Sequence, residues 1–246
     1  MLLSRLLQDY RAAIARLPAD QPLNRGDILS DLFLLERSGP IEIFYAPHNE
    51  YINPPAQVVI VGITPGWTQT RIAYETAREG LEQRLKDEEI CRRAKESAGF
   101  AGSMRTHLID MLDELQLHRT LSLSSCGELF AAHRDLLHTT SLLRFPVFLE
   151  NKNYTGAKPF LLTVPLLRDK ALAFIEEELK LLANQPLIVP LGKTVEGVLR
   201  ILDQEGKLQD KRVLWGFPHP SGANGHRRRQ FESNRERMQE ILNNAF

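Results

Sequence analysis

Short runs of apolar residues alternate along this chain with longer stretches in which apolar residues recur at helical spacing. The strongest run, residues 57–63 (QVVIVGI), is β-branched and has the composition of a strand buried on both faces. Residues 187–192 (LIVPLG) form a second short buried run. Further extended segments are predicted at 41–45, 136–143 and 213–217.

The longer amphipathic stretches predict helices between these strands. Their expected ranges are 2–17, 25–37, 68–97 with Gly80 as a break, 103–117, 166–183, 194–203 and 225–243. Residues 144–156, rich in Pro, Asn and aromatic residues, are expected to form a loop. Strands alternating with helices indicate an α/β layered fold with a mainly parallel sheet.

The composition indicates a globular protein. The 246 residues are 43% hydrophobic and 25% charged, which suits one substantial core, so one domain over 1–246 is expected. Two cysteines, Cys91 and Cys126, are too few for a disulfide framework or a four-cysteine cluster, and they fit a reducing cytoplasm. No run approaches the roughly 18 apolar residues of a membrane span. Charged residues interrupt the opening segment 1–17, which predicts an amphipathic helix and no signal peptide. We expect a cytoplasmic monomer.

Charge is unevenly distributed although the formal net charge is zero. Residues 211–237 hold seven Lys or Arg against two Glu, which is 7 − 2 = +5, so the remainder sums to −5. A basic face on a neutral protein suggests a local anionic partner such as a phosphate backbone. On charge alone, a solvated helix face explains the same pattern equally well.

Two turns that follow predicted strands carry unusual chemistry. Residues 62–66 (GITPG) follow the first central strand, and residues 217–222 (FPHPSG) follow the last. Ligands of α/β folds bind at the carboxyl ends of strands, so we expect the two turns to face one another across one crevice. Flanking prolines hold His219 on a stiff backbone, which suits a ligand contact, although a loop histidine bonded to a carbonyl is the simpler alternative.

The ordered pair G-x-x-P-G and H-P-S-G resembles motifs one and two of the uracil-DNA glycosylase superfamily. The segment 188–194 (IVPLGKT) is similar to the strand and Leu-Gly pair that precede motif two in many members, and the resemblance spans about 57–238. It implies a three-layer α/β/α sandwich around a central, mainly parallel four-stranded sheet. Residues 1–50 would form a helical extension packed on this domain.

The resemblance also implies a reaction. Members of this family flip a damaged base out of DNA and hydrolyse its N-glycosidic bond. His219 matches the histidine that stabilises the departing base, and a donor of this kind is commonly worth ~3–4 kcal/mol. The turn residues Gly62, Ile63, Pro65 and Gly66 would surround the base. The implied DNA-phosphate contacts are Pro220, Ser221, Gly222, Asn224, Arg227, Arg228 and Arg229, the last three beside a helix N-terminus.

Thr64 departs from the family pattern, which places Asp, Asn, Glu or less often Ala at this position to activate or position water. Threonine is neither a base near neutral pH nor an amide, but it can orient water through one hydrogen bond. The resemblance therefore implies slow or differently tuned hydrolysis, or an inactive protein. Gly66 stands where one branch carries a tyrosine, which implies a more open pocket.

The base-contacting residues are a second departure. The family's asparagine near the end of a middle strand has no counterpart in residues 138–146, where Thr140 or Ser141 would substitute. Tyr74 is the nearest ring for stacking on the base and Trp67 the next, and both also suit helix packing.

Other signals carry less weight. The segment 191–194 (LGKT) lacks the first glycine of a P-loop, and His107, His118, His133 and His138 show no zinc spacing. We expect no metal and no cofactor. The leading hypothesis is a glycosylase that excises uracil or a related base from single- or double-stranded DNA. The alternatives are a catalytically weak or inactive DNA-binding member, and a hydrolase or transferase acting on small nucleosides or nucleotides.

Overall fold

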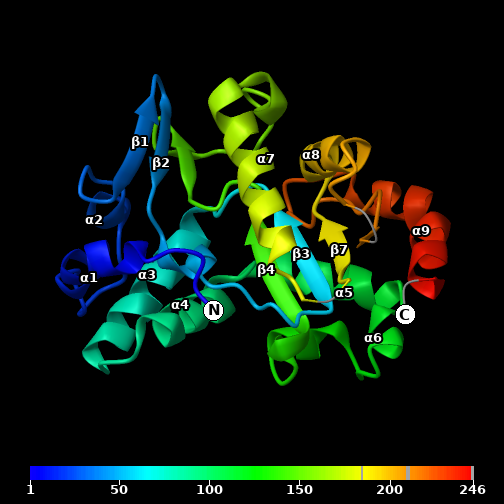
Figure 1. Cartoon of the computed structure of the whole chain (residues 1–246), viewed down its shortest axis with the longest axis horizontal. Helices are drawn as coiled ribbons and strands as arrows, with labels where there is room; N and C mark the ends of the chain where they lie inside the picture. Colours follow the sequence, from blue (N-terminus) through cyan, green and yellow to red (C-terminus); the bar gives the residue numbers. More distant parts are fainter. Residues whose placement is uncertain (184, 209–210, 245–246) are drawn as a thin grey trace.

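The computed structural model describes residues 1–183, 185–208 and 211–244 and is built around a parallel sheet (Figure 1). In spatial order its strands are β4 (Leu137–Ser141), β3 (Val58–Gly62), β7 (Leu187–Pro190) and β8 (Arg212–Val213). Each neighbouring pair is parallel. The prediction of a mainly parallel four-stranded sheet is confirmed, and the two strongest apolar runs form its centre.

Helices cover both faces of this sheet. Because side chains alternate along a strand, Val59 and Val61 point to one face, while Val58 and Ile60 point to the other. The first face packs against α7 (Pro165–Lys180) and α8 (Lys193–Gln204), and the second against α5 (Ser103–Glu114) and α9 (Arg227–Asn243). The three-layer α/β/α arrangement predicted for the chain is therefore confirmed.

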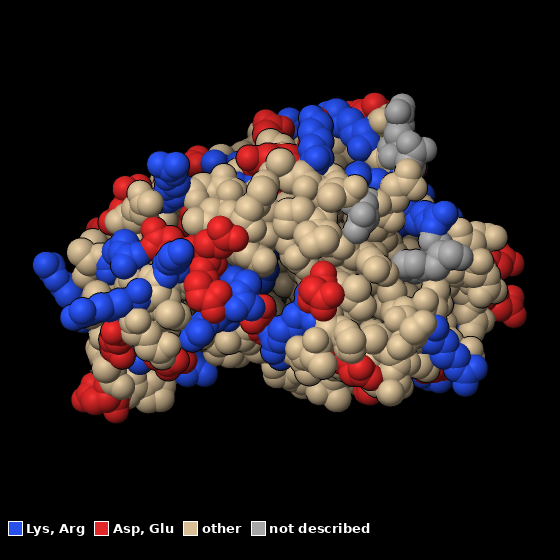
Figure 2. All heavy atoms as spheres, turned by 60° about the horizontal axis from the view of Figure 1, so that its bottom comes forward, with Lys and Arg blue, Asp and Glu red and all other residues tan. Residues whose placement is uncertain are grey.

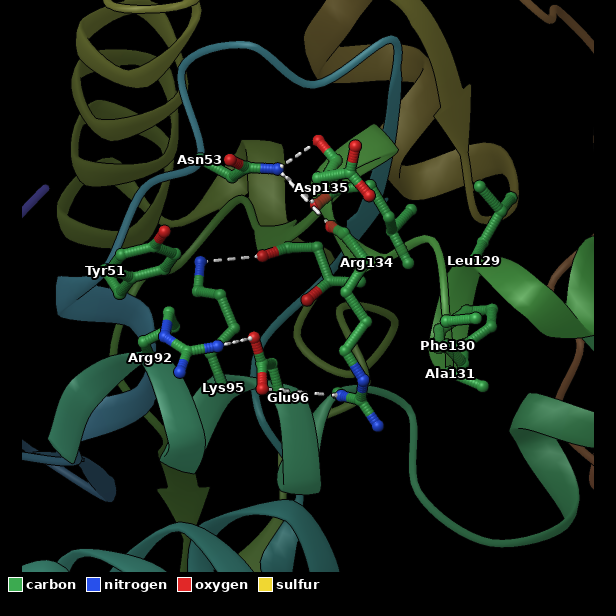
Figure 3. A pocket seen from close by; sticks show the side chains of 14 residues that line it. Tyr51, Asn53, Arg92, Lys95, Glu96, Leu129, Phe130, Ala131, Arg134 and Asp135 are labelled. Carbon is green, nitrogen blue, oxygen red and sulfur yellow. Dashed lines mark hydrogen bonds and ion pairs between the residues drawn. The ribbon is translucent and has the colours of Figure 1, made fainter. Parts of the chain in front are cut away.

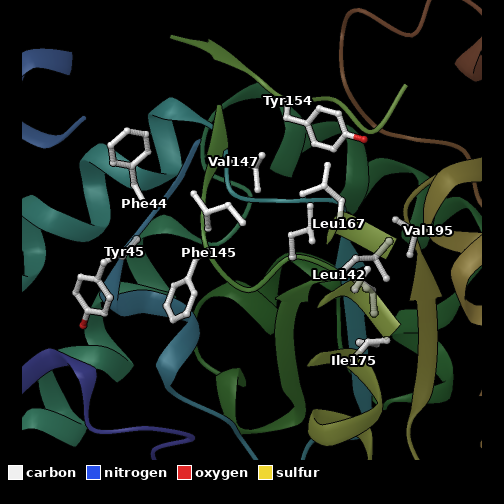
Figure 4. Close-up of a cluster of buried hydrophobic side chains, with 14 of the residues drawn as sticks. Phe44, Tyr45, Leu142, Phe145, Val147, Tyr154, Leu167, Ile175 and Val195 are labelled. Atoms are coloured by element: carbon white, nitrogen blue, oxygen red, sulfur yellow. The ribbon is translucent and has the colours of Figure 1, made fainter. Parts of the chain in front are cut away.

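A second, antiparallel sheet lies beside these layers. Its spatial order is β1 (Leu34–Ser38), β2 (Ile41–Phe44), β5 (Val147–Leu149) and β6 (Lys152–Asn153). Phe44, Phe145 and Val147 bury their side chains in the larger hydrophobic cluster, which the two sheets share (Figure 4). This sheet positions residues at the edge of the candidate site.

The structure corrects four predictions, three of them through the second sheet. The helix expected at 25–37 is only α2 (Arg25–Ile28), capped by Asn24, and the chain then enters β1. The loop expected at 144–156 contains β5 and β6. The helical extension expected at 1–50 is therefore also wrong in part, since it contains the β1–β2 hairpin besides α1 (Leu6–Ala15) and the 3-10 turn η1 (Pro47–Glu50). The long expected helix 68–97 is two helices.

These two helices are α3 (Trp67–Glu82) and α4 (Asp87–Ala98), and the break between them falls after Gly80, not at it. A Cβ at Gly80 would lie 2.9 Å from Cγ1 of Ile90, so this glycine lets the two helices pack closely. The remaining short elements are α6 (Leu117–Thr120), η2 (Cys126–Phe130), η3 (Arg134–Leu136) and η4 (Leu161–Thr163). Among the described residues, no helix combines the length and apolarity needed to cross a bilayer.

Candidate active site

The two motif turns meet in one cleft of about 610 Å³. It opens where β3, β4 and β7 end, which is where ligands bind in α/β sheets. Of the residues singled out in the sequence, those that line it are Gly62, Ile63, Thr64, Gly66, Trp67, Ser141, His219, Ser221, Gly222 and Asn224. Pro65 and Pro220 are buried and shape the turns from within.

His219 presents a defined hydrogen-bond donor to this cleft. Its Nδ1 accepts the backbone N–H of Ser221 at 3.2 Å, so the proton of the neutral ring resides on Nε2. Burial lowers the pKa of His219, which keeps the imidazole neutral near pH 7. Asn224 fixes the same backbone through a 3.1 Å hydrogen bond from Nδ2 to the carbonyl of His219. His219 is thus arranged to donate through Nε2 without carrying a charge.

Gly192 brings the end of β7 against His219. Its φ of +87° is a conformation that favours glycine, and a Cβ there would lie 3.0 Å from Cβ of His219. Its N–H also donates to the carbonyl of Phe217 at 3.0 Å. The Leu-Gly pair noted in the sequence therefore has a steric role, because only a residue without a side chain allows this approach.

The hydroxyl of Thr64 is held by backbone groups. It donates to the carbonyl of Phe145 at 3.0 Å and accepts the N–H of Val147 at 3.0 Å, which ties the first motif turn to β5. The single proton of the hydroxyl is used, and one lone pair remains for a water molecule. The described residues that line the cleft include no Asp or Glu, so the lining offers no carboxylate base.

The aromatic residues differ from the sequence expectation. Tyr74 is fully buried and donates its hydroxyl to the carbonyl of Tyr45 at 2.8 Å, so its ring belongs to the core and not to the cleft. Trp67 does line the cleft, with the guanidinium of Arg25 5.0 Å from the centre of its ring. Phe100, which the sequence analysis missed, lines the cleft, and a Cβ at Gly62 would lie 3.2 Å from its Cε1. Its only sequence signal is an aromatic residue between two predicted helices.

An amide also reaches the cleft from an unexpected element. Asn153, on β6, accepts the N–H of Trp67 through Oδ1 at 3.0 Å, which leaves the two donors of Nδ2 without a partner among the described residues. Ser141 lines the cleft, whereas Thr140 turns into the interior and donates to the carboxylate of Glu178. Asn153 lies in the Asn-rich segment 144–156, for which the sequence predicts a loop. A predicted loop does not indicate where any of its side chains points.

The three arginines after the second motif have different environments. Arg227 donates to the carbonyls of Pro220 and Ser221 at 3.0 Å each and so braces the loop. Arg228 forms ion pairs with Glu114 and Glu232. In the described part of the chain Arg229 has no ion-pair partner, and it is exposed. Lys193, the first residue of α8, lines the cleft as its one basic side chain among the described lining residues.

A second pocket, of about 430 Å³, lies between α4 and η3. The cationic groups that line it are paired within the protein: Arg92 contacts Glu96 at 2.6 Å, Arg134 lies 4.0 Å from Glu96, and Lys95 donates to the carbonyl of Thr139 at 2.8 Å (Figure 3). The lysine covers the edge of β4, which is a structural role. Figure 2 shows basic and acidic side chains interspersed over this side of the molecule. The cleft between the motif turns is therefore the better candidate.

Comparisons with known proteins identify the family of the chain. Residues 50–245 match the model of the uracil DNA glycosylase superfamily. The chain is 42% identical over 240 residues to the uncharacterized protein YoxB of Bacillus subtilis (strain 168), covering 97% of this chain and 93% of that protein. The crystal structure of Pedobacter heparinus SMUG2 is similar at 12% identity with a TM-score of 0.46, covering 95% and 98% of the two chains. The chain belongs to the uracil DNA glycosylase superfamily.

Proposed function

We propose that this protein hydrolyses the N-glycosidic bond of a deaminated base, such as uracil, flipped out of DNA. The observation that carries the proposal is the neutral His219, whose Nε2–H donor lies in a cleft formed by both family motifs. The family implies base excision, and the cleft lies in the region that matches the family model.

The chemistry is a dissociative hydrolysis. The C1′–N bond breaks with its electron pair going to the base, the sugar becomes oxocarbenium-like, and water adds to C1′ with loss of a proton. His219 donates its hydrogen bond to the oxygen on which the departing base carries negative charge, a contribution of ~3–4 kcal/mol to the barrier. The N-termini of α3 and α8 begin at the cleft with Trp67 and Lys193, and their positive dipole ends favour the same charge.

Activation of the attacking water contributes less to this mechanism than stabilisation of the leaving base. Thr64 orients a water molecule through its remaining lone pair, but it does not take a proton from it. Because the described lining contains no carboxylate, stabilisation of the leaving base supplies most of the catalysis. The expected rate is slow compared with a site that holds a positioned base.

Asn153 supports a deaminated substrate. Nδ2 offers two donors to a bound base, whereas Oδ1 already accepts the N–H of Trp67 and keeps only one lone pair, so the amide faces the base mainly as a donor. At the position where deamination replaces an amino group by a carbonyl, a donor pairs with O4 of uracil or O6 of hypoxanthine better than with the amino group of cytosine or adenine. Phe100 provides the ring on which the base stacks, and Gly66 leaves the cleft open beside it.

The DNA backbone is held by the second motif loop. Ser221 and Gly222 line the cleft beside His219, and Arg229 and Lys193 provide basic groups that are not paired with carboxylates in the described chain. Arg227 keeps the loop in shape for this contact. Phosphate groups flanking the flipped nucleotide are the expected partners.

A second candidate function is DNA binding without hydrolysis. It is favoured by Thr64, whose hydroxyl has its proton bound to the carbonyl of Phe145 and is unable to act as a base. The proposed contacts with DNA are the same for the glycosylase and for the binding protein, so only a measurement of base excision distinguishes the two functions.

The test is alkali-revealed strand cleavage of single- and double-stranded oligonucleotides that carry uracil, hypoxanthine or the normal bases. His219→Ala should reduce cleavage about 10²–10³-fold. His226→Ala, an exposed histidine of the same loop, is the matched control and should cleave as the wild type. If neither the wild type nor His219→Ala cleaves the oligonucleotides but both still bind them in a salt-sensitive way, the function is DNA binding without hydrolysis. Turnover of free nucleosides without DNA would overturn both.

A further inference from the structure

Three side chains of metal-binding type converge away from the cleft. Asp113 lies near the end of α5, His118 on α6, and Cys126 begins η2. One candidate ligand atom from each of these residues lies within 4.8 Å of the other two. Cys126 is fully buried, and the side chains of Asp113 and His118 are 29% and 18% exposed. Thiolate, imidazole and carboxylate together form a ligand set that zinc accepts.

The spacing of two of these atoms is that of metal ligands. Nδ1 of His118 lies 3.2 Å from Oδ1 of Asp113, yet this buried nitrogen makes no hydrogen bond. In a tetrahedral zinc site with Zn–N and Zn–O bonds of about 2.0–2.1 Å, two ligand atoms are separated by about 3.3 Å. The unpartnered nitrogen therefore occupies the position that a shared ion requires.

The carboxylate is already oriented by a shell of donors. Asp113 accepts the backbone N–H of Cys126 on Oδ1 at 2.6 Å and the hydroxyl of Ser125 on Oδ2 at 2.6 Å. Metal-binding carboxylates are commonly held by such outer hydrogen bonds, and each oxygen retains a second lone pair. The end of α5 and the start of η2, which carry two of the three ligands, are thereby fixed to one another before any ion binds.

We propose that Asp113, His118 and Cys126 bind one Zn²⁺ ion, with water as the fourth ligand. Binding releases the thiol proton of Cys126 to solvent and forms a Zn–S bond, with no change of oxidation state. The ion would tie α5 to α6 and η2. It would also steady the second motif loop, because His107 on α5 contacts the carbonyl of Pro220 through Nδ1 at 3.0 Å. The site is independent of the proposed function.

The experiment uses the full chain, reduced and freed of metal with a chelator, and Co²⁺ as the spectroscopic probe. The wild type should bind one Co²⁺ with a thiolate-to-cobalt charge-transfer band and the d–d bands of tetrahedral coordination, and Zn²⁺ should displace it. Cys126→Ser should abolish the charge-transfer band, and His118→Ala should weaken Co²⁺ binding at least about tenfold. Cys91→Ser is the matched control, since Cys91 is the other thiol of the chain and is buried in a different cluster.

Two results would overturn the proposal. One is a wild type that shows no charge-transfer band, a measurement that does not depend on whether any variant folds. The other is a band that survives in Cys126→Ser or disappears in Cys91→Ser. As a second readout, Zn²⁺ should raise the Tm of the wild type by linkage and leave the Tm of Cys126→Ser unchanged.

Discussion

Replacing Gly192 by Ala should displace His219 without removing any hydrogen-bonding group from the cleft. The φ of +87° costs an alanine about 1–3 kcal/mol. The added Cβ would also lie 3.0 Å from Cβ and 3.4 Å from the backbone N of His219, so the histidine must move by a few tenths of an ångström. At roughly 2–4 °C per kcal/mol for a chain of this size, Tm should fall by about 2–12 °C.

The same displacement should slow cleavage more than it weakens DNA binding. A shift of 1 Å at a catalytic group costs about 10²-fold, so a few tenths of an ångström should cost about tenfold in kcat. Thermal unfolding and single-turnover cleavage of a uracil-containing oligonucleotide measure the two effects. Nitrogen NMR of the imidazole reports whether Nδ1 of His219 still accepts the N–H of Ser221.

Gly225→Ala is the control for this substitution, because Gly225 is not among the residues that line the cleft. No atom lies within 4 Å of a Cβ at Gly225, and its φ lies outside the left-handed range. It should therefore behave as the wild type in Tm and in cleavage rate. If Gly192→Ala and Gly225→Ala gave the same Tm and the same rate, the steric role assigned to Gly192 would be wrong.

Three further predictions test other contacts. Thr64→Val should destabilise the protein by about 2–4 kcal/mol in urea unfolding, because it leaves a backbone carbonyl and a backbone N–H unpaired, and Thr64→Ser should restore most of the loss. Burial, followed by the charge of Lys95, lowers the pKa of His48 to about 3, below the value of about 6.5 in the unfolded chain, so acid favours unfolding. Between pH 7 and pH 5 the wild type should therefore lose about 2 kcal/mol more than His48→Gln, and equal losses would contradict the buried neutral ring. Arg229→Ala should reduce the salt dependence of DNA binding by about one unit of slope in anisotropy titrations, whereas Arg228→Ala, which removes an already paired group, should change it less.

The central sheet and the meeting of the two turns could be predicted from the sequence for a physical reason. Residues 57–63 and 187–192 are continuous apolar runs, which in an alternating pattern indicate parallel strands buried on both faces. Once β3, β7 and β8 are parallel neighbours, the turns that follow β3 and β8 must emerge at the same edge. The position of His219 beside the first motif follows from that geometry.

The second sheet could not be predicted in the same way. The segment that becomes β1 has apolar residues that fit a helix as well as a strand, and its partner β2 is a short run. β5 and β6 are three and two residues long, so their pairing depends on strands far away in the sequence. The roles of Asn153 and Phe100 depend on this tertiary arrangement, which local pattern does not contain.

Similar reasoning applies to the candidate metal ligands. Asp113, His118 and Cys126 lie on three separate short elements, with spacings that match no zinc pattern. Tyr74 shows the converse case, in which a residue at nearly the family's spacing is directed into the core by the packing of α3 against Tyr45. The motifs and their order in the sequence therefore predict where the cleft lies, but they do not predict every side chain that lines it.

The threonine of the first motif and the added sheet are best understood together. The hydroxyl of Thr64 donates to the carbonyl of Phe145 and accepts from the N–H of Val147, which anchors β5 at the cleft. An aspartate could still accept the N–H of Val147, but it would place a carboxylate oxygen against the carbonyl of Phe145, acceptor facing acceptor, and would lose that half of the anchor. β6, which pairs with β5, brings the amide of Asn153 to the cleft. The residue that stands in place of the family's water-activating group therefore also supports the sheet that brings an amide to the cleft.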